Sequence, residues 1–185
     1  MARVYALLQP DGSLLATRQK GNGWAILPGL QGVEGRGKNL TILLSGLDVL
    51  GVSATIPARN EREVRRAAPY AIEDELAQSV EASHVALSPP DKANPSAPRD
   101  INVIGMARLQ EVIDDLTERG LADADIMAAH SVLPRQDMLL EGPGLILGRL
   151  GGRSFTMDAS LGTDVLAGLT DAHPDLILYG AHIAR

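Results

Sequence analysis

The stretch of sequence that decides the fold is LDVLGVSATIPARNEREVRRAAPYAIEDELAQSVEASHVAL, which runs from Leu47 to Leu87. Its first part, Val49 to Ile56, is rich in β-branched residues and predicts a strand. Asn60 predicts a helix N-terminus, because its side chain can cap the helix while Glu63 completes a capping box. His84 to Leu87 then predicts a short strand, so a single helix lies between two strands.

The helix predicted after Asn60 spans residues 60–79 and has one apolar face. Its apolar residues recur at every fourth position, which places them on one side of a helix. Pro69 cannot donate a hydrogen bond to the Arg65 carbonyl and therefore predicts a kink. The residues of the apolar face are Val64, Ala68, Ile72, Leu76 and Val80.

The residues before this stretch predict antiparallel strands. Arg3–Gln9 and Leu14–Arg18 are strand-like segments on either side of Pro10-Asp11-Gly12, a sequence typical of a hairpin turn. Residues 21–37 are rich in glycine and predict a loop or a short irregular strand. Leu40–Leu44 predicts a further strand, so a hairpin opens the chain.

The residues after the stretch predict a proline-rich connection and then a β-α-β unit. Residues 88–99 contain four prolines in twelve residues and predict a linker or loop. Ile101–Ile104 predicts a strand, and a helix from about Ala107 should end at Gly120. With a strand at Asp125–Ala129, the order predicts a right-handed parallel crossover.

The last part of the chain returns to hairpin character. Gly144–Arg149 and Arg153–Asp158 flank a Leu-Gly-Gly turn, and Leu161–Leu169 predicts a short helix. Leu176–Tyr179 predicts a final strand, after which the chain stops within six residues, at Arg185. We therefore expect a final subdomain to lie beyond this sequence.

Composition excludes several classes of function. The net charge of -6 does not suit a nucleic-acid surface, which needs basic residues to neutralise phosphates. The absence of cysteine excludes disulfides, thiolate metal sites and cysteine nucleophiles, and is typical of a reducing compartment. No apolar segment approaches the roughly 20 residues that span a bilayer.

The motifs that could carry chemistry all favour structural roles. Asp11 and Gly12 are adjacent in a turn, whereas a nucleotide-binding hairpin of the Asp-x-Gly kind separates these two residue types by one residue. The glycine-rich GPGLILGRLGG lacks the Lys-Ser/Thr of a P-loop and predicts a hairpin. We assign no catalytic residue, cofactor site or metal ligand, because no metal-binding spacing occurs among the histidines. These are His84, His130, His173 and His182.

Charged residues on the predicted helix are the candidates for a partner-binding surface. The acidic triplet at residues 73–75 has no basic residue three or four positions away and lies where the helix dipole disfavours negative charge. Either the triplet is solvated or paired with distant residues, or it forms a docking surface. The candidate partner-binding residues are Arg65, Arg66, Glu73, Asp74 and Glu75.

The motif in this helix resembles the signature of the type II secretion system protein L family. In that signature a strand ends in a proline, and a basic helix start leads to Ala-x-Pro-Tyr-Ala-x-Glu-Asp-x-Leu-Ala and a His-bearing strand. INVIGMARLQEVIDDLTERGLADADIMAAHSVLP and GLILGRLGGRSFTMD follow the family plan more loosely. The matching residues are Ala67, Pro69, Tyr70, Ala71, Glu73, Asp74, Leu76, Ala77 and His84.

The resemblance implies an α/β fold of the actin-like, ribonuclease-H-like kind, with mixed sheets and flanking helices. We expect a first subdomain at residues 1–87, the connection at 88–99, and a second β-α-β-containing part at 100–185. The resemblance further implies that the chain is a non-catalytic scaffold on the cytoplasmic side of the bacterial inner membrane. Full-length members of the family are implied to have one membrane helix and a periplasmic domain as well.

The implied partners are the N-terminal domain of the secretion ATPase and other inner-membrane platform proteins. A homodimer is compatible with the resemblance, and no nucleic acid is expected as a partner. Two alternatives remain open at this stage. One is a nucleotide-binding actin-like protein of the pilus-assembly or cell-division type. The other is a small-molecule kinase, for which 185 residues are few.

Overall fold

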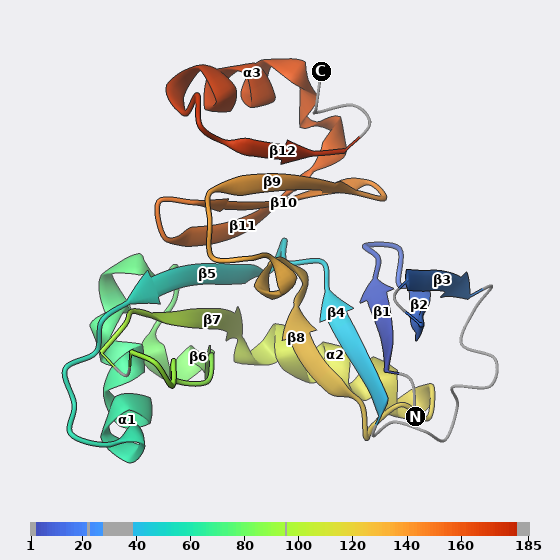
Figure 1. Cartoon of the computed structure of the whole chain (residues 1–185). Coiled ribbons are helices and arrows are strands. Elements are labelled where there is room, and N and C mark those ends of the chain that lie inside the picture. Colours follow the sequence, from blue (N-terminus) through green and yellow to red (C-terminus); the bar gives the residue numbers. More distant parts are fainter. Residues whose placement is uncertain (1–2, 22, 28–38, 95, 181–185) are drawn as a thin grey trace.

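The computed structural model of the chain describes residues 3–21, 23–27, 39–94 and 96–180. Within them, two mixed β-sheets pack against three α-helices, which confirms the predicted α/β class with flanking helices (Figure 1). The helices are α1 (Glu61–Ala71), α2 (Met106–Glu118) and α3 (Gly162–Ala172). Short 3-10 turns are η2 (Glu73–Glu75), η3 (Val80–Ala82), η4 (Ala129–Val132) and η5 (Ala159–Leu161).

The first sheet, sheet A, has the strand order β3-β2-β1-β4-β8. β1, β2 and β3 form an antiparallel meander, whereas β4 and β8 run parallel to β1. The opening hairpin is confirmed. Residues 21–37 predicted a loop or a short irregular strand, and Gly23–Leu27 within them forms the strand β3; residues 22 and 28–38 lie outside the described residues. The strands are β1 (Val4–Leu8), β2 (Leu14–Lys20), β3 (Gly23–Leu27), β4 (Leu40–Leu44) and β8 (Asp125–Ala128).

The second sheet, sheet B, has the strand order β12-β9-β10-β11-β5-β7-β6. Its two parts meet where β11 pairs with β5 through one register pair, Ser154 and Gly51. The hairpin of β10 and β11 is confirmed, while the neighbouring strand β9 was not predicted. The strands are β5 (Val49–Ala54), β6 (Ser83–Leu87), β7 (Arg99–Gly105), β9 (Met138–Gly142), β10 (Leu145–Leu150), β11 (Arg153–Asp158) and β12 (Ile177–Tyr179).

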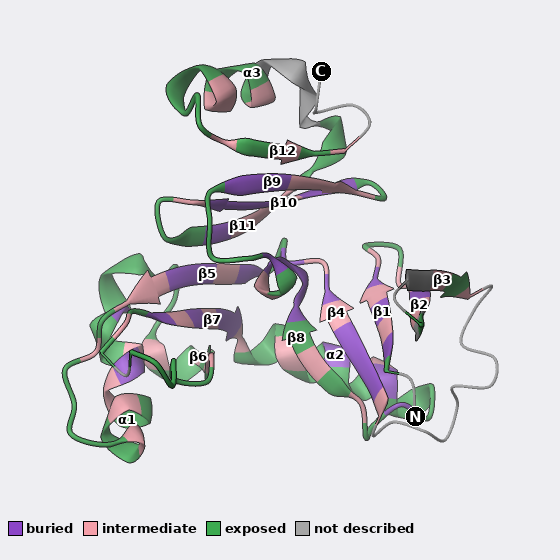
Figure 2. Cartoon of the chain, viewed as in Figure 1, coloured by how far each residue is buried: buried purple, intermediate pink, exposed green. Residues whose placement is uncertain are grey.

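Three apolar clusters hold the sheets and helices together, and the helices turn their exposed sides to solvent (Figure 2). Val112 and Leu116 of α2 pack against one face of sheet A. Ile72, just after α1, packs against β5 and β7, and the apolar side of α3 contributes Leu166 and Leu169 against β9 and β10. Each helix therefore covers a different part of the two sheets.

The predicted β-α-β crossover is wrong, because β7 and β8 lie in different sheets. β7 pairs antiparallel with β5 and β6, while β8 pairs parallel with β4. The rule for parallel crossovers applies only when both strands share a sheet. α2 therefore carries the chain from sheet B back to sheet A.

The predicted helix over residues 60–79 is also too long, because α1 ends at Ala71. The proline at position 69 removes a helical hydrogen bond, and the acidic residues that follow are unfavourable at a helix C-terminus. The chain forms the turn η2 and is extended at Leu76. Ile72 and Leu76 nevertheless reach the core from this irregular backbone.

The proline-rich segment is a loop that joins β6 to β7, two neighbouring antiparallel strands of sheet B. Both sheets take strands from each side of this loop, since β8 belongs to sheet A and β5 to sheet B. The boundary predicted at residues 88–99 therefore does not separate the sheets.

Candidate functional site

The start of α1 is fixed by a capping arrangement close to the predicted one. The Asn60 side chain accepts a hydrogen bond from the Glu63 backbone N–H at 3.0 Å. The Glu63 carboxylate reaches back to the backbone N–H of Arg59, also at 3.0 Å, one residue earlier than in a standard capping box. The helix therefore begins at a position set by its own sequence.

Glu61 fixes α1 to sheet B. Its carboxylate accepts hydrogen bonds from the guanidinium of Arg99 at 2.9 and 3.2 Å, and it forms an ion pair with Arg65 at 3.3 Å. The hydrogen bonds from Arg99 lower the pKa of Glu61. Of the two candidate arginines, Arg65 is thus engaged within the helix, while Arg66 is exposed.

The acidic triplet divides into two parts. Glu75 forms an ion pair with Arg153 of β11 at 2.7 Å, which is the distant pairing that sequence left open. Glu73 and Asp74 are exposed, and neither makes an ion pair with any other residue that the structure describes. The unpaired acids therefore remain available at the end of α1.

Exposed residues form a stripe along α1 that ends at these acids. Arg62, Arg66 and Tyr70 lie four residues apart and therefore share one side of the helix, away from the buried Ala68. Tyr70 is 66% exposed. We call Arg62, Arg66, Tyr70, Glu73 and Asp74 the α1 surface.

A second group of charges lies where the two parts of sheet B meet. Asp100 of β7 accepts hydrogen bonds from the Arg149 guanidinium of β10 at 3.2 and 3.3 Å. Arg135, which precedes β9, donates to the same carboxylate at 3.1 Å. The side chain of Arg149 is only 8% exposed. This cluster links the β9–β11 hairpins to β7.

His130, in η4, is fully buried beside this cluster. Its Nε2 lies 2.9 Å from the Asn102 amide oxygen, and its Nδ1 has no partner among the described residues. Burial, together with the positive charge of Arg149, lowers the pKa of His130 to about 4, although Asp100 acts in the opposite direction. The imidazole is therefore neutral at pH 7, in agreement with a structural role.

We expect the stability of the protein to fall as the pH drops from 7 to 5. The unfolded chain takes up a proton near the ordinary histidine pKa of 6.5, while folded His130 does so only near 4. The stabilisation is complete above the unfolded pKa and is lost as the pH approaches 4. The expected loss between pH 7 and pH 5 is about 2 kcal/mol.

Urea unfolding at the two pH values measures this loss, with His130→Gln as the comparison. The amide keeps a hydrogen-bonding partner for Asn102 but does not titrate, so its stability should change little over this range. Equal pH dependence of the two proteins would show that the histidine is not responsible.

The turn between β1 and β2, where an actin-like nucleotide site would have its acid, is held by internal contacts. The Asp11 carboxylate accepts the Ser13 backbone N–H at 2.9 Å, and hydrogen bonds from Ser13 lower the pKa of Asp11. The guanidinium of Arg119 donates to the Gly12 carbonyl at 2.7 Å. Asp11 and Gly12 therefore form a hairpin turn, as the sequence predicted.

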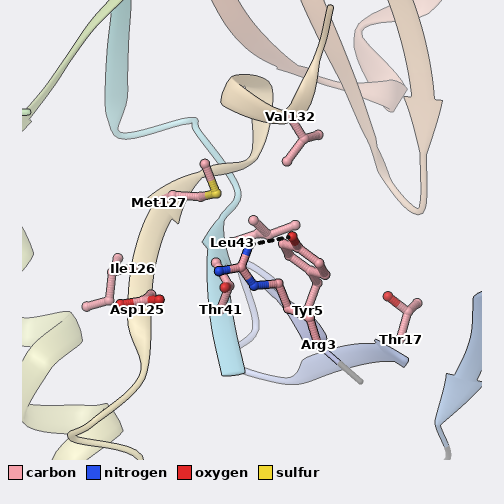
Figure 3. A pocket seen from close by; sticks show the side chains of 9 residues that line it. All are labelled: Arg3, Tyr5, Thr17, Thr41, Leu43, Asp125, Ile126, Met127 and Val132. Atoms are coloured by element: carbon pink, nitrogen blue, oxygen red, sulfur yellow. Dashed lines mark hydrogen bonds between the residues drawn. The ribbon is translucent and has the colours of Figure 1, made fainter. Parts of the chain in front are cut away.

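A hollow lies on the face of sheet A opposite to the one that packs against α2, and its lining side chains are drawn in Figure 3. It measures about 780 Å³. On the side of the hollow formed by β1, the side chains of Arg3 and Tyr5 point toward each other. The Arg3 Nη1 lies 3.5 Å from the Tyr5 hydroxyl. Leu43, Met127 and Val132 add apolar side chains to the lining. Asp125 is the one acidic residue among the described residues that line this hollow, so it lacks the clustered acids of a metal centre.

The described residues show neither a metal-binding cluster nor a helix that could span a membrane. No group of three or more His, Asp or Glu side chains there is arranged to hold a metal ion; His182 lies outside this part of the chain. Nor does any helix in these residues have the length and apolar character needed to cross a membrane.

Solved structures with a similar fold include the following two. The first is the cytoplasmic domain of EpsL, an inner membrane component of the type II secretion system of Vibrio cholerae, with a TM-score of 0.65 and 18% identity over 98% of this chain and 86% of that one. The second is the PilM-PilN type IV pilus biogenesis complex, with a TM-score of 0.52 and 14% identity over 94% of this chain and 66% of that one. Both neighbours are actin-like, which confirms the predicted fold.

A comparison with protein families identifies the chain more directly. A search of the curated proteins found no match. The family described as type II secretion system (T2SS), protein L matches residues 6–142, which include α1, α2 and all the strands from β2 to β9. This match covers well over half of the sequence, and the chain therefore belongs to the type II secretion system protein L family.

Proposed function

We propose that this protein is a non-catalytic scaffold that recruits the secretion ATPase to the cytoplasmic side of the bacterial inner membrane. Membership of the protein L family supports a role as a secretion-system component. The described relative in Vibrio cholerae is named as a cytoplasmic domain of an inner membrane component, which supports the same location here. Other platform proteins and a second copy of the chain are further partners under this proposal.

The observation that carries the proposal is the α1 surface. It presents an exposed aromatic side chain, Tyr70, between basic and acidic residues. Exposed aromatic residues surrounded by charged residues are typical of protein interfaces. The acids Glu73 and Asp74 belong to the motif that resembles the family signature, although neither supports the fold through an ion pair that the structure describes.

Charge reversal at Glu73 and Asp74 should weaken binding of the N-terminal domain of the ATPase. We expect Glu73→Lys/Asp74→Lys to raise the Kd at least about tenfold, which corresponds to roughly 1.4 kcal/mol. The protein should stay folded, because positive charge is favourable at a helix C-terminus. Isothermal titration of this chain with the ATPase domain from the same organism measures the effect.

The matched control is Glu118→Lys/Asp171→Lys, which makes the same change in net charge at exposed positions on α2 and α3. It should bind as the unmodified protein does. If the reversal at Glu73 and Asp74 left the affinity unchanged, or if both double variants weakened it equally, the α1 surface would not be the docking site.

A nucleotide-binding function is the second candidate. A hollow of about 210 Å³ lies at the carboxyl ends of β1 and β4, where α/β sheets commonly bind ligands. This is smaller than the roughly 300 Å³ at which small-molecule sites usually begin. Titration with magnesium-ATP tests this candidate: binding of ATP without the ATPase domain would favour it over the scaffold.

A further inference from the structure

Among the residues that the structure describes, β8 is an edge strand whose outer side has no neighbour in sheet A. It pairs with β4 on one side, from Asp125 opposite Thr41 to Ala128 opposite Leu44, and ends the strand order on the other. In a parallel ladder, backbone groups of alternate residues point to each side of a strand. The outer side of β8 therefore presents N–H and C=O groups on which a further strand can pair.

A hollow lies on each face of the sheet beside this edge. One is the 780 Å³ hollow on the face of sheet A away from α2, which we call the outer hollow. The other, of about 370 Å³, lies on the opposite face of the sheet, next to α2. Asp125, Ile126 and Met127 line both hollows. An extended segment paired with β8 would therefore have a hollow on each of its faces.

The alternation of side chains in β8 matches these two hollows. Asp125 and Met127 are in register with Thr41 and Leu43, which line the outer hollow. Ile126, one residue out of phase with them, faces the side on which α2 packs. Successive residues of an added strand would enter the two hollows in turn.

Exposed apolar residues surround the edge. Met127 is 36% exposed, Val132 46% and Ile113 of α2 39%. The second hollow continues this apolar surface through Leu109 toward β6. Burial of such side chains is favourable, so a partner with apolar side chains would gain stability on both faces of the sheet.

The strand β8 itself has one charged residue, Asp125. Asp125 is exposed, and its carboxylate has no ion-pair or hydrogen-bond partner among the described residues. An incoming strand with a lysine or arginine beside Asp125 would complement it. Such a pair would also set the register of the incoming strand along β8.

We propose that the free edge of β8 accepts an extended segment of a partner protein as a sixth strand of sheet A. The segment has apolar side chains at successive positions, which enter the hollows on the two faces, and a lysine or arginine next to Asp125. This site is separate from the α1 surface and does not depend on the ATPase as the partner.

Selection from a library of random twelve-residue peptides displayed on phage tests the proposal with the full chain. We expect enriched peptides to be rich in β-branched and aromatic apolar residues, with one basic residue at a constant position. Peptides whose apolar residues recur with helical spacing, or the absence of enrichment, would overturn the proposal.

A synthetic copy of the most enriched peptide then locates the site. We expect Asp125→Lys to weaken its binding at least about tenfold, whereas Asp123→Lys, in the preceding turn, leaves it unchanged. Amide hydrogen exchange in β8 should slow about tenfold or more in the complex, because its unpaired N–H groups become hydrogen-bonded.

Two results would contradict strand addition even if a peptide binds. One is equal loss of affinity in both lysine variants, which would indicate a general charge effect. The other is unchanged hydrogen exchange in β8. Glu73→Lys/Asp74→Lys should bind the peptide normally, so failure of this proposal and failure of the ATPase-docking proposal can be told apart.

Discussion

Asp100→Asn is expected to destabilise the protein more than any other single substitution considered above, by about 3 kcal/mol. The carboxylate neutralises Arg149, whose side chain is 8% exposed, and it also binds Arg135. Without it, a buried guanidinium would lose its counter-charge, and removal of one partner of a buried pair commonly costs about 3 to 5 kcal/mol. We expect the low end because the Asp100 side chain is 22% exposed.

Urea unfolding at pH 7 measures this effect, with Asp123→Asn as a control at an exposed aspartate in a turn. The control should change the free energy of unfolding by less than about 0.5 kcal/mol. A double-mutant cycle with Arg149→Met separates the pair from its surroundings. If the two single variants and the double variant showed additive effects, Asp100 and Arg149 would not stabilise the fold as a pair.

Gly51→Ala is expected to have the second-largest effect, about 2 to 3 kcal/mol, because there is no space for a methyl group. A Cβ at this position would lie 2.7 Å from the Ser154 carbonyl oxygen and 2.8 Å from the Nε2 of His130. The nearest atom belongs to the backbone, so no side-chain rotation relieves the contact. Gly51 and Ser154 also form the register pair between β5 and β11.

Thermal unfolding followed by circular dichroism measures this destabilisation, with Gly168→Ala as the matched control. Gly168 lies within α3 and would have no heavy atom within 4 Å of an added Cβ. The same substitution should stabilise the protein there by about 0.5 to 1 kcal/mol, since alanine favours the helix. A Gly51→Ala protein as stable as the parent would contradict the close approach of β5 and β11.

Local sequence determined most of the helices and strands. Asn60 and Glu63 predicted where α1 begins, and Gly120, with φ at 72°, follows the C-cap residue Arg119 at the end of α2, close to the predicted position. These signals work because caps and turns depend on residues only a few positions apart. The motif around Tyr70 likewise predicted the family and, through it, the actin-like fold.

The candidate surface could be predicted only in part. Sequence showed that residues 73–75 lack a partner nearby on the helix, and Glu73 and Asp74 are indeed exposed without an ion pair in the described structure. It could not show that Glu75 pairs with Arg153, 78 residues away. Nor did any local signal reveal the cluster of Asp100 and Arg149, whose charges meet across sheet B.

The sequence by itself thus determined the family, the capped start of α1 and the hairpins, because each depends on short-range patterns. Only the tertiary structure decided which sheet each strand joins. It placed β7 in sheet B and β8 in sheet A, and within the described part of the chain it left the outer edge of β8 without a neighbouring strand. The physical reason is that strand pairing uses backbone groups common to all residues, so the choice of partner depends on packing between distant segments.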